Sequence, residues 1–327
     1  ITTVAVIWFG GWRIARNTMQ IGDMMAFMQY AMQVMFAIIM VTVVYFMVPR
    51  AQASAARINE VLDMEPEIKD PPEPKQWKSC KGKVEFRDVT FFYPGAEVPA
   101  LSGISFTAQP GQVTAIIGGT GSGKSTLINL ILRFYDVTEG SVLVDDIDVR
   151  EVAQKELRRR IGYVPQTPVL FSGTVADNIR YGKDDASDEE ICHAAEVAQA
   201  AGFVEAMKNG YDSRVSQGGK NLSGGQKQRL SIARALIRKP SIYIFDDSFS
   251  ALDFQTEARL RAALQQETSD ATVIIVAQRV STVMDADNIA VLDEGRLVGF
   301  GKHQELLTTC QVYREIVMSQ LSEEEIA

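Results

Sequence analysis

The sequence is poor in the residues that build disulfide frameworks and metal centres. It holds 3 cysteines and 2 histidines among 327 residues. Cys80, Cys192 and Cys310 lie far apart and form no C-x-x-C pair, so they predict reduced thiols and neither a disulfide nor a zinc framework. His193 and His303 are also far apart in sequence. This pattern argues against a metal site built from cysteine or histidine.

Basic residues are in deficit as well. The 33 lysines and arginines are outnumbered by 41 aspartates and glutamates, which gives a formal net charge of −8. A nucleic-acid-binding protein would instead show a basic stripe or patch. We therefore expect no nucleic-acid partner.

Charge is missing altogether from one long segment near the start. Residues 24–48 carry no charged side chain, and this run exceeds the roughly 20 residues that a helix needs to cross a bilayer. A buried helix of a soluble protein with apolar residues on every face would be unusual. Residues 1–12 are apolar but too few to span a membrane. We therefore predict a complete span at about 24–48, the end of a preceding span at 1–12, and a chain that is the C-terminal part of a longer multi-pass protein.

The composition changes after the span. A helical pattern continues to residue 62, so residues 1–62 are predicted to be transmembrane helices with a cytoplasmic extension. Four prolines between residues 66 and 74 then forbid a helix and favour an extended linker over residues 63–80.

A globular domain is predicted over residues 81–327. It opens with two strand-like segments, 83–86 and 89–93, and turns helical at about 167–236, most clearly over 187–206. Further segments are short and nearly all apolar, as buried parallel strands are: 242–245, 271–276 and 289–292. The pattern indicates an α/β domain with a helical insertion.

One glycine-rich run fits the phosphate-binding pattern G-x-x-x-x-G-K-[ST]. It lies between a short apolar strand, 113–117, and a helical pattern, 125–132. In this frame the backbone N–H groups wrap phosphates, the lysine reaches the terminal phosphates, and the serine hydroxyl holds Mg²⁺. A glycine-rich loop without a ligand would not need the lysine and the hydroxyl. The run is Gly118, Gly119, Thr120, Gly121, Ser122, Gly123, Lys124 and Ser125, and we add Thr126 to the nucleotide-binding set.

A second motif, about a hundred residues later, indicates which class of phosphate-loop protein this is. Serine and two glycines before a helix make another phosphate-binding surface. This motif, with the residues after it, resembles the signature sequence of ABC-transporter ATPase domains. It comprises Leu222, Ser223, Gly224, Gly225 and Gln226.

The resemblance covers almost the whole chain. Residues 1–62 resemble the end of the fifth and all of the sixth membrane helix of an ABC exporter half, and residues 81–320 resemble its complete nucleotide-binding domain. The implied fold is an α/β P-loop ABC ATPase domain, with a mixed-sheet core and a helical subdomain, preceded by transmembrane α-helices. The implied cofactors are ATP and Mg²⁺. In this family the signature of one subunit completes the ATP site of the other, in a head-to-tail dimer.

The resemblance also implies roles for further residues. Tyr93 would stack on adenine, with a core strand tyrosine as the alternative. Gln166 would contact Mg²⁺ or the attacking water, and Asp246, at the end of an apolar strand, would help to hold Mg²⁺. A D-loop that crosses the dimer interface is expected at Ser250, Ala251, Leu252 and Asp253.

Two catalytic positions depart from the family pattern. Asp247 stands where an active member has a glutamate that orients the attacking water, and Gln278 stands in place of a histidine that contacts the γ-phosphate. Aspartate is one methylene shorter, and a misplacement of about 1 Å can cost about 10²-fold in rate. Glutamine cannot become cationic, so the charge-assisted part of its contact is lost. We therefore expect an ATPase whose own site has low turnover.

The pattern as a whole resembles the degenerate-site subunit of heterodimeric bacterial multidrug exporters. It implies a second, non-identical half-transporter as partner, a small lipophilic substrate, and a plasma-membrane protein whose nucleotide-binding domain is cytoplasmic. Two alternatives stay open: a homodimeric exporter of lipid or peptide, and a regulatory ABC protein that uses ATP as a ligand only. An ABC ATPase acting on DNA or ribosomes would have no span at 24–48.

Overall fold

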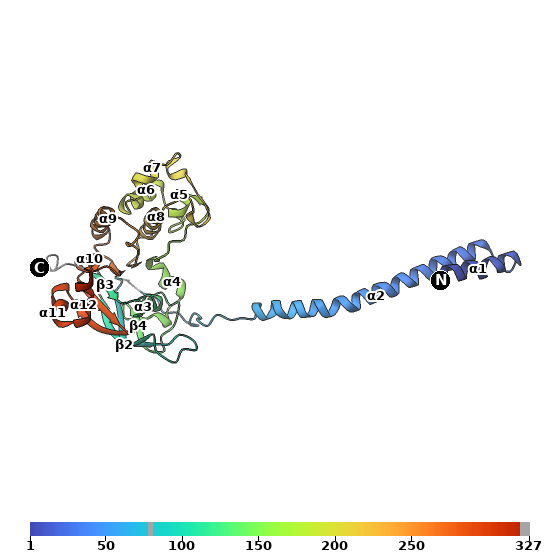
Figure 1. Cartoon of the computed structure of the whole chain (residues 1–327), viewed down its shortest axis with the longest axis horizontal. Coiled ribbons are helices and arrows are strands. Elements are labelled where there is room, and N and C mark those ends of the chain that lie inside the picture. Colours follow the sequence, from blue (N-terminus) through green and yellow to red (C-terminus); the bar gives the residue numbers. More distant parts are fainter. Residues whose placement is uncertain (78–80, 321–327) are drawn as a thin grey trace. The chain divides into compact units, whose positions relative to one another are not determined.

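The computed structural model describes residues 1–77 and 81–320. Its contacts divide the chain into two units, Ile1–Glu67 and Ile68–Ala327. Cys80 and the acidic residues after Gln320 lie outside the described residues, whereas Cys192 and Cys310 are free thiols. Figure 1 shows the helices and strands of both units.

The first unit consists of two helices, α1 (Thr2–Ala15) and α2 (Ile21–Leu62). They meet where Met24 packs against Gly10, because a Cβ at Gly10 would lie 2.8 Å from the Met24 sulfur. The helix α2 has no buried residue in the described structure, and its most apolar 18-residue window has a mean hydropathy of 2.3. By length and composition it can cross a membrane. It continues through Pro49 as a single helix.

The second unit is built on two main sheets. The strands of the smaller sheet lie in the order β2-β1-β4-β5, and its paired strands are antiparallel. Those of the larger sheet lie in the order β12-β11-β3-β10-β9-β6, parallel except for β12 at one edge. The bounds are β1 Val84–Phe91, β2 Leu101–Ala108, β3 Val113–Gly118, β4 Glu139–Val144, β5 Ile147–Asp148, β6 Ile161–Val164, β9 Ile242–Asp246, β10 Thr272–Val276, β11 Asn288–Asp293 and β12 Arg296–Gly301.

Both faces of the central parallel strands β3, β9 and β10 are covered, which explains why these strands are almost purely apolar. The domain has two hydrophobic clusters, one on each face of the larger sheet. In β3, Ala115 and Ile117 belong to one cluster and Ile116 belongs to the other. The second cluster also takes in the apolar side of helix α3 (Lys124–Ile131) and the inner face of the smaller sheet. Helix α3 is therefore held between the sheets by burial.

The helical part groups apart from the sheets in Figure 1. It contains α5 Val175–Arg180, α6 Asp188–Val197, α7 Ala201–Glu205 and α8 Gly224–Leu236, with a small antiparallel sheet of β7 Gly173–Thr174 and β8 Arg214–Val215. The remaining helices are α4 Gln154–Arg159, α9 Phe254–Glu267, α10 Val280–Val283, α11 His303–Thr309 and α12 Gln311–Gln320, and the 3-10 turns are η1 Val149–Glu151, η2 Gly210–Asp212 and η3 Gln217–Gly219. The predicted fold, a mixed-sheet core with a helical subdomain after a long apolar helix, is confirmed.

Two elements differ in detail from the sequence prediction. The segments expected as separate strands at 83–86 and 89–93 form one strand, β1, whose pairing shifts around Asp88 with φ +47°. The helix expected over 187–206 is broken, because Gln199 adopts φ +56° between α6 and α7. At both places the irregularity lies at a single residue with a left-handed backbone, and neither residue is a glycine or a proline that would have indicated it in the sequence.

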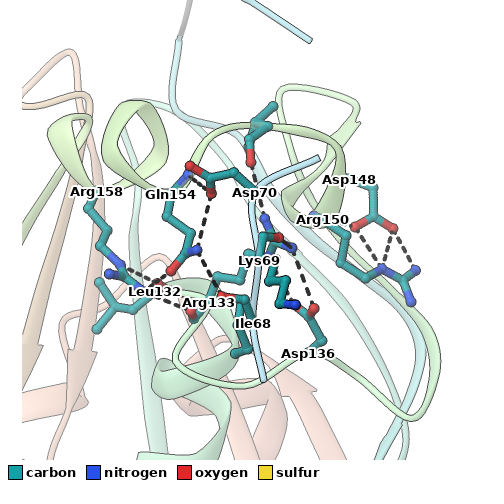
Figure 2. A network of polar contacts seen from close by, with 11 residues as sticks. Ile68, Lys69, Asp70, Leu132, Arg133, Asp136, Asp148, Arg150, Gln154 and Arg158 are labelled. Atoms are coloured by element: carbon teal, nitrogen blue, oxygen red, sulfur yellow. Dashed lines mark hydrogen bonds and ion pairs between the residues drawn. The ribbon is translucent and has the colours of Figure 1, made fainter. Parts of the chain in front are cut away.

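Part of the predicted linker packs on the second unit. Figure 2 shows residues 68–70 against the C-terminal end of α3 and the start of α4. The buried guanidinium of Arg133 donates to the carbonyl oxygens of Lys69, at 3.0 Å, and Val152, at 3.1 Å. The backbone N–H of Gln154 donates to Asp70 Oδ1 at 2.9 Å. The chain is therefore fixed to the domain from Ile68 onward.

Candidate nucleotide site

The glycine-rich run forms the turn between β3 and α3, at the carboxyl edge of the parallel strands. Gly123 is the N-cap of α3 with φ +98°, and no side chain caps the helix. A Cβ at Gly118 would collide with the Leu292 carbonyl oxygen. The first N–H groups of α3 thus stay free for an anion, which the helix dipole also favours.

Lys124, the first residue of α3, lies over this loop. Its ammonium donates to the carbonyl oxygens of Gly118, at 2.8 Å, and Gly119, at 2.7 Å. Burial lowers the pKa of Lys124 below its ordinary value, while Asp247 and Asp246 oppose that shift. The lysine therefore places a partly desolvated positive charge beside the free N–H groups.

Two carboxylates lie at the same edge, because Asp246 ends β9 and Asp247 follows it. Asp246 is buried, and Tyr163 donates its hydroxyl to Asp246 Oδ2 at 3.5 Å. Burial, together with the charge of Asp247, raises the pKa of Asp246. Burial also raises the pKa of Asp247, against the hydrogen bond from Gln166. Tyr163 was not among the residues singled out from the sequence, although its strand neighbours that of Asp246.

The structure brings Gln166, Asp247 and Gln278 together. Both glutamine Nε2 atoms donate to Asp247 Oδ2, each at 3.1 Å. The three residues follow β6, β9 and β10, which are neighbours in the sheet. Asp247 itself adopts φ +46°, so the chain turns sharply as it leaves β9. The two departures from the family pattern therefore share one hydrogen-bonded cluster with Gln166.

Tyr93 lies within an aromatic group beside α3. Its ring centroid is 4.9 Å from that of Phe91 and 5.3 Å from that of Tyr135, both edge-on. Its hydroxyl is 2.9 Å from Thr126 Oγ1. The side chain is partly buried and ends next to the phosphate loop.

The signature residues lie at the start of α8. Ser223 and Gln226 form a capping box, in which the Gln226 N–H donates to Ser223 Oγ and the Ser223 N–H donates to Gln226 Oε1 at 2.9 Å. A Cβ at Gly225 would lie 3.0 Å from the Ala251 carbonyl oxygen, so the D-loop passes close to this segment. Within residues 1–77 and 81–320, no hydrogen bond or ion pair joins residues 222–226 to residues 118–125.

These features fit a nucleoside triphosphate. The glycine turn, the uncapped helix and Lys124 favour phosphate oxygens, and Ser122 Oγ is buried without a partner among the described residues. Asp246, Gln166 and the Ser125 hydroxyl offer oxygen ligands, which Mg²⁺ prefers alongside phosphate and water. The described residues contain no cluster of three or more His, Cys, Asp or Glu side chains that could hold a metal ion without the nucleotide.

Comparison with known proteins agrees with this geometry. Residues 101–250 match the ABC transporter family. Over 323 residues the chain is 50% identical to an uncharacterized ABC transporter ATP-binding protein of Mycobacterium tuberculosis, covering 98% of this chain and 55% of that protein. A second uncharacterized ABC transporter ATP-binding protein, from Bacillus subtilis, is 44% identical over 98% of this chain and 55% of its own length.

Two further matches extend the comparison: one relative whose name includes a substrate, and one solved structure. The fatty acid ABC transporter ATP-binding/permease protein of Mycobacterium bovis is 40% identical over 96% of this chain and 49% of its own length. A bacterial Atm1-family ABC exporter solved with ATP bound superposes with a TM-score of 0.88 at 36% identity, over 98% of this chain and 56% of that one.

The chain thus spans about half the length of the relatives it matches. Its matched part includes the phosphate loop, the signature segment and both carboxylates after β9. Fold, site geometry and similarity together show that this chain carries the ATP-binding domain of an ABC transporter, preceded by a long apolar helix, and that it is similar over nearly its whole length to the corresponding part of a bacterial ABC exporter.

Proposed function

We propose that the chain couples ATP binding to the export of a small lipophilic substrate across the plasma membrane. The observation that carries the proposal is the convergence of the phosphate loop, Lys124 and the Asp246–Asp247 pair at one edge of a sheet, in a chain that also has α2. Since ATP is cytosolic, the ATP-binding domain is placed in the cytoplasm. A lipophilic cargo agrees with the name of one relative, the fatty acid ABC transporter of Mycobacterium bovis.

Each site residue receives a role on this proposal. Lys124 and the N–H groups of α3 hold the β- and γ-phosphates, and Tyr93 borders the adenine. Ser125, Asp246 and Gln166 hold Mg²⁺, which neutralises phosphate charge when it is bound. Gln278 donates to the γ-phosphate. The D-loop, residues 250–253, lies at the interface with a second domain.

The chain's own site is proposed to bind ATP well and to cleave it slowly. Asp247 is too short to bring its carboxylate to the attacking water, and Oδ2 already accepts two amide N–H groups. Gln278 supplies a neutral donor where a cation would stabilise the transition state more. The binding residues, in contrast, match the family pattern.

The proposed partner is a second, non-identical half-transporter. Ser223 and Gly224 are exposed at the N-terminus of α8, with no link to the chain's own phosphate loop among the described residues. This supports their use on the ATP of another subunit. A homodimer would pair two weak sites, whereas a partner with a glutamate and a histidine at the positions of Asp247 and Gln278 would supply an efficient one.

The test is ATP-driven transport by the full-length protein, expressed alone and with a candidate partner half-transporter that has the glutamate and the histidine. Inside-out vesicles should accumulate a fluorescent lipophilic dye or a labelled fatty acid only when ATP is present. Lys124→Ala should abolish uptake. Uptake that needs no partner would favour the homodimeric alternative. ATP binding without uptake or hydrolysis in any combination would favour a regulatory protein and contradict an exporter.

A further inference from the structure

The last described residue of α12 is bonded to the segment that carries Gln278. Gln320 Nε2 donates to the backbone carbonyl oxygen of Gln278 at 2.8 Å. The backbone N–H of Val280 donates to Gln320 Oε1, also at 2.8 Å. One side-chain amide thus spans the turn that leaves β10, and we name this pair of hydrogen bonds the Gln320 brace.

The helix that carries the brace is fixed in the core. Tyr313 and Val317 of α12 are both fully buried. The Tyr313 hydroxyl lies 2.8 Å from His303 Nδ1, which joins α12 to α11. Val280, at the other end of the brace, is buried as well. The brace therefore connects the turn to an element that cannot shift without disrupting the core.

On the side of the nucleotide the turn is supported through side chains, including an ion pair between the Arg279 guanidinium and the buried Glu257 at 4.0 Å. The Gln278 side chain reaches Asp247 Oδ2, and the Arg279 guanidinium donates to the Ser250 carbonyl oxygen at 3.4 Å. Both of these contacts involve long side chains on exposed positions. The backbone carbonyl of Gln278 is instead held by Gln320. The brace therefore fixes the position of the Gln278 backbone, and with it the reach of the Gln278 side-chain amide.

The chemistry of the brace is specific to glutamine. The carbonyl oxygen of Gln278 requires a donor, and the N–H of Val280 requires an acceptor, and a planar amide offers one of each. A glutamate of the same size offers acceptors only, so it would face the Gln278 carbonyl oxygen with an oxygen. Glutamate therefore removes half of the brace and leaves the volume nearly unchanged.

We propose that Gln320 is a positioning residue that holds Gln278 in place to recognise the γ-phosphate. The inference rests on the ATP-binding role proposed above and extends it to a residue outside the motifs of the site. Its consequence is selective. Loosening the brace weakens the binding of ATP, which has a γ-phosphate, and not that of ADP, which lacks one.

The experiment measures the dissociation constants of Mg-ATP and Mg-ADP for the full-length protein in its complex with the partner. Gln320→Ala and Gln320→Glu should each lower the ATP-over-ADP preference by about three- to tenfold, as expected for the loss of one or two hydrogen bonds. The affinity for ADP should stay unchanged. Gln311→Ala is the matched control, because Gln311 lies on the same helix and bonds only to Glu315 among the described residues. It should behave as wild type.

A double-mutant cycle separates positioning from general damage. In a Gln278→Ala background the Gln320 variants should have no further effect on the nucleotide preference. An unchanged preference in both Gln320 variants, or an equal loss for ATP and ADP, overturns the brace. A wild-type protein that binds neither nucleotide overturns the proposed function itself. Wild-type binding without any preference for ATP overturns the role of Gln278 and the brace with it.

Discussion

Asp247 is strained and hydrogen-bonded at the point where the chain leaves β9. It carries a left-handed backbone, a pKa raised by burial, and two amide donors on one oxygen. On our proposal its short side chain leaves the attacking water without a well-placed base. The neighbouring Gln278 compounds this deficit, because it is neutral at every pH.

Restoring both side chains should restore turnover at this site. We expect the double replacement Asp247→Glu with Gln278→His to raise the rate of ATP hydrolysis by at least about tenfold, part of the roughly 10²-fold that a 1 Å misplacement can cost. The measurement is steady-state phosphate release by the full-length protein. Asp247→Asn serves as the control and should lower the residual rate. No gain in the double variant would show that another feature limits hydrolysis.

The buried charge of Asp246 should cost stability at neutral pH. Burial raises its pKa on folding, so its favourable contribution is complete below the unfolded pKa and is lost as pH rises through the folded value. We expect Asp246→Asn to raise the melting temperature at pH 7 by about 2–4 °C and to impair ATP hydrolysis. The gain should vanish in acid. The exposed Asp184→Asn should leave the melting temperature unchanged at both pH values.

At the scale of helices, two capping boxes give a matched comparison. Ser223 caps α8 in the signature segment, and Ser187 caps α6 with the same pattern of hydrogen bonds. Each Ser→Ala replacement should cost about 1 kcal/mol of stability. Only Ser223→Ala should also reduce ATP hydrolysis by the assembled complex, measured as phosphate release. If Ser187→Ala lowered hydrolysis as much as Ser223→Ala, the signature serine would act only as a helix cap.

The buried Arg133 joins residues 68–70 to the end of α3 through a guanidinium fork (Figure 2). Lysine cannot reproduce these bonds. We expect Arg133→Lys to lower the free energy of unfolding by about 2–3 kcal/mol, measured by urea denaturation of the detergent-solubilised protein. Arg150→Lys, at a more exposed pair with Asp148 in the same region, should cost less than about 1 kcal/mol. Similar costs at both positions would contradict a special role for Arg133.

Elements with a strong local signal could be predicted from the sequence, and others could not. The apolar segments at 242–245 and 289–292 correspond to β9 and β11, because fully buried parallel strands have no polar face. The break at Gln199 was missed, since α6 ends there in a left-handed turn, with the Ala200 N–H donating to the Ala195 carbonyl oxygen at 2.7 Å, at a residue that is neither glycine nor asparagine. The contacts of residues 68–70 were missed too, because prolines indicate an extended chain but not where it packs.

At the scale of the whole molecule, the composition of the site was predictable and its internal contacts were not. The glycine pattern predicted the phosphate loop and the family resemblance implied Asp246 and Gln166, and the structure places all three at one edge of the larger sheet. The convergence of Gln166 and Gln278 on one oxygen of Asp247 depends on the order of strands in the sheet, which the sequence does not state. Gln320 carried no sequence signal, since its partners are some forty residues away.

The assembly proposed here divides labour between two chains. This chain supplies a site that retains ATP and a signature segment that completes the site of its partner. ATP binding at both sites would close the pair of domains, and hydrolysis at the partner's site would let them reopen. Two copies of this chain would close in the same way but reopen slowly.

ATP hydrolysis by the purified full-length chain, alone and mixed with its partner half-transporter, tests the central claim most directly. We predict slow phosphate release from the chain alone and a rate at least about tenfold higher in the mixture. We also predict that the higher rate is lost when the partner's catalytic glutamate is replaced. Rapid hydrolysis by the chain alone, unchanged by adding the partner, would contradict the account.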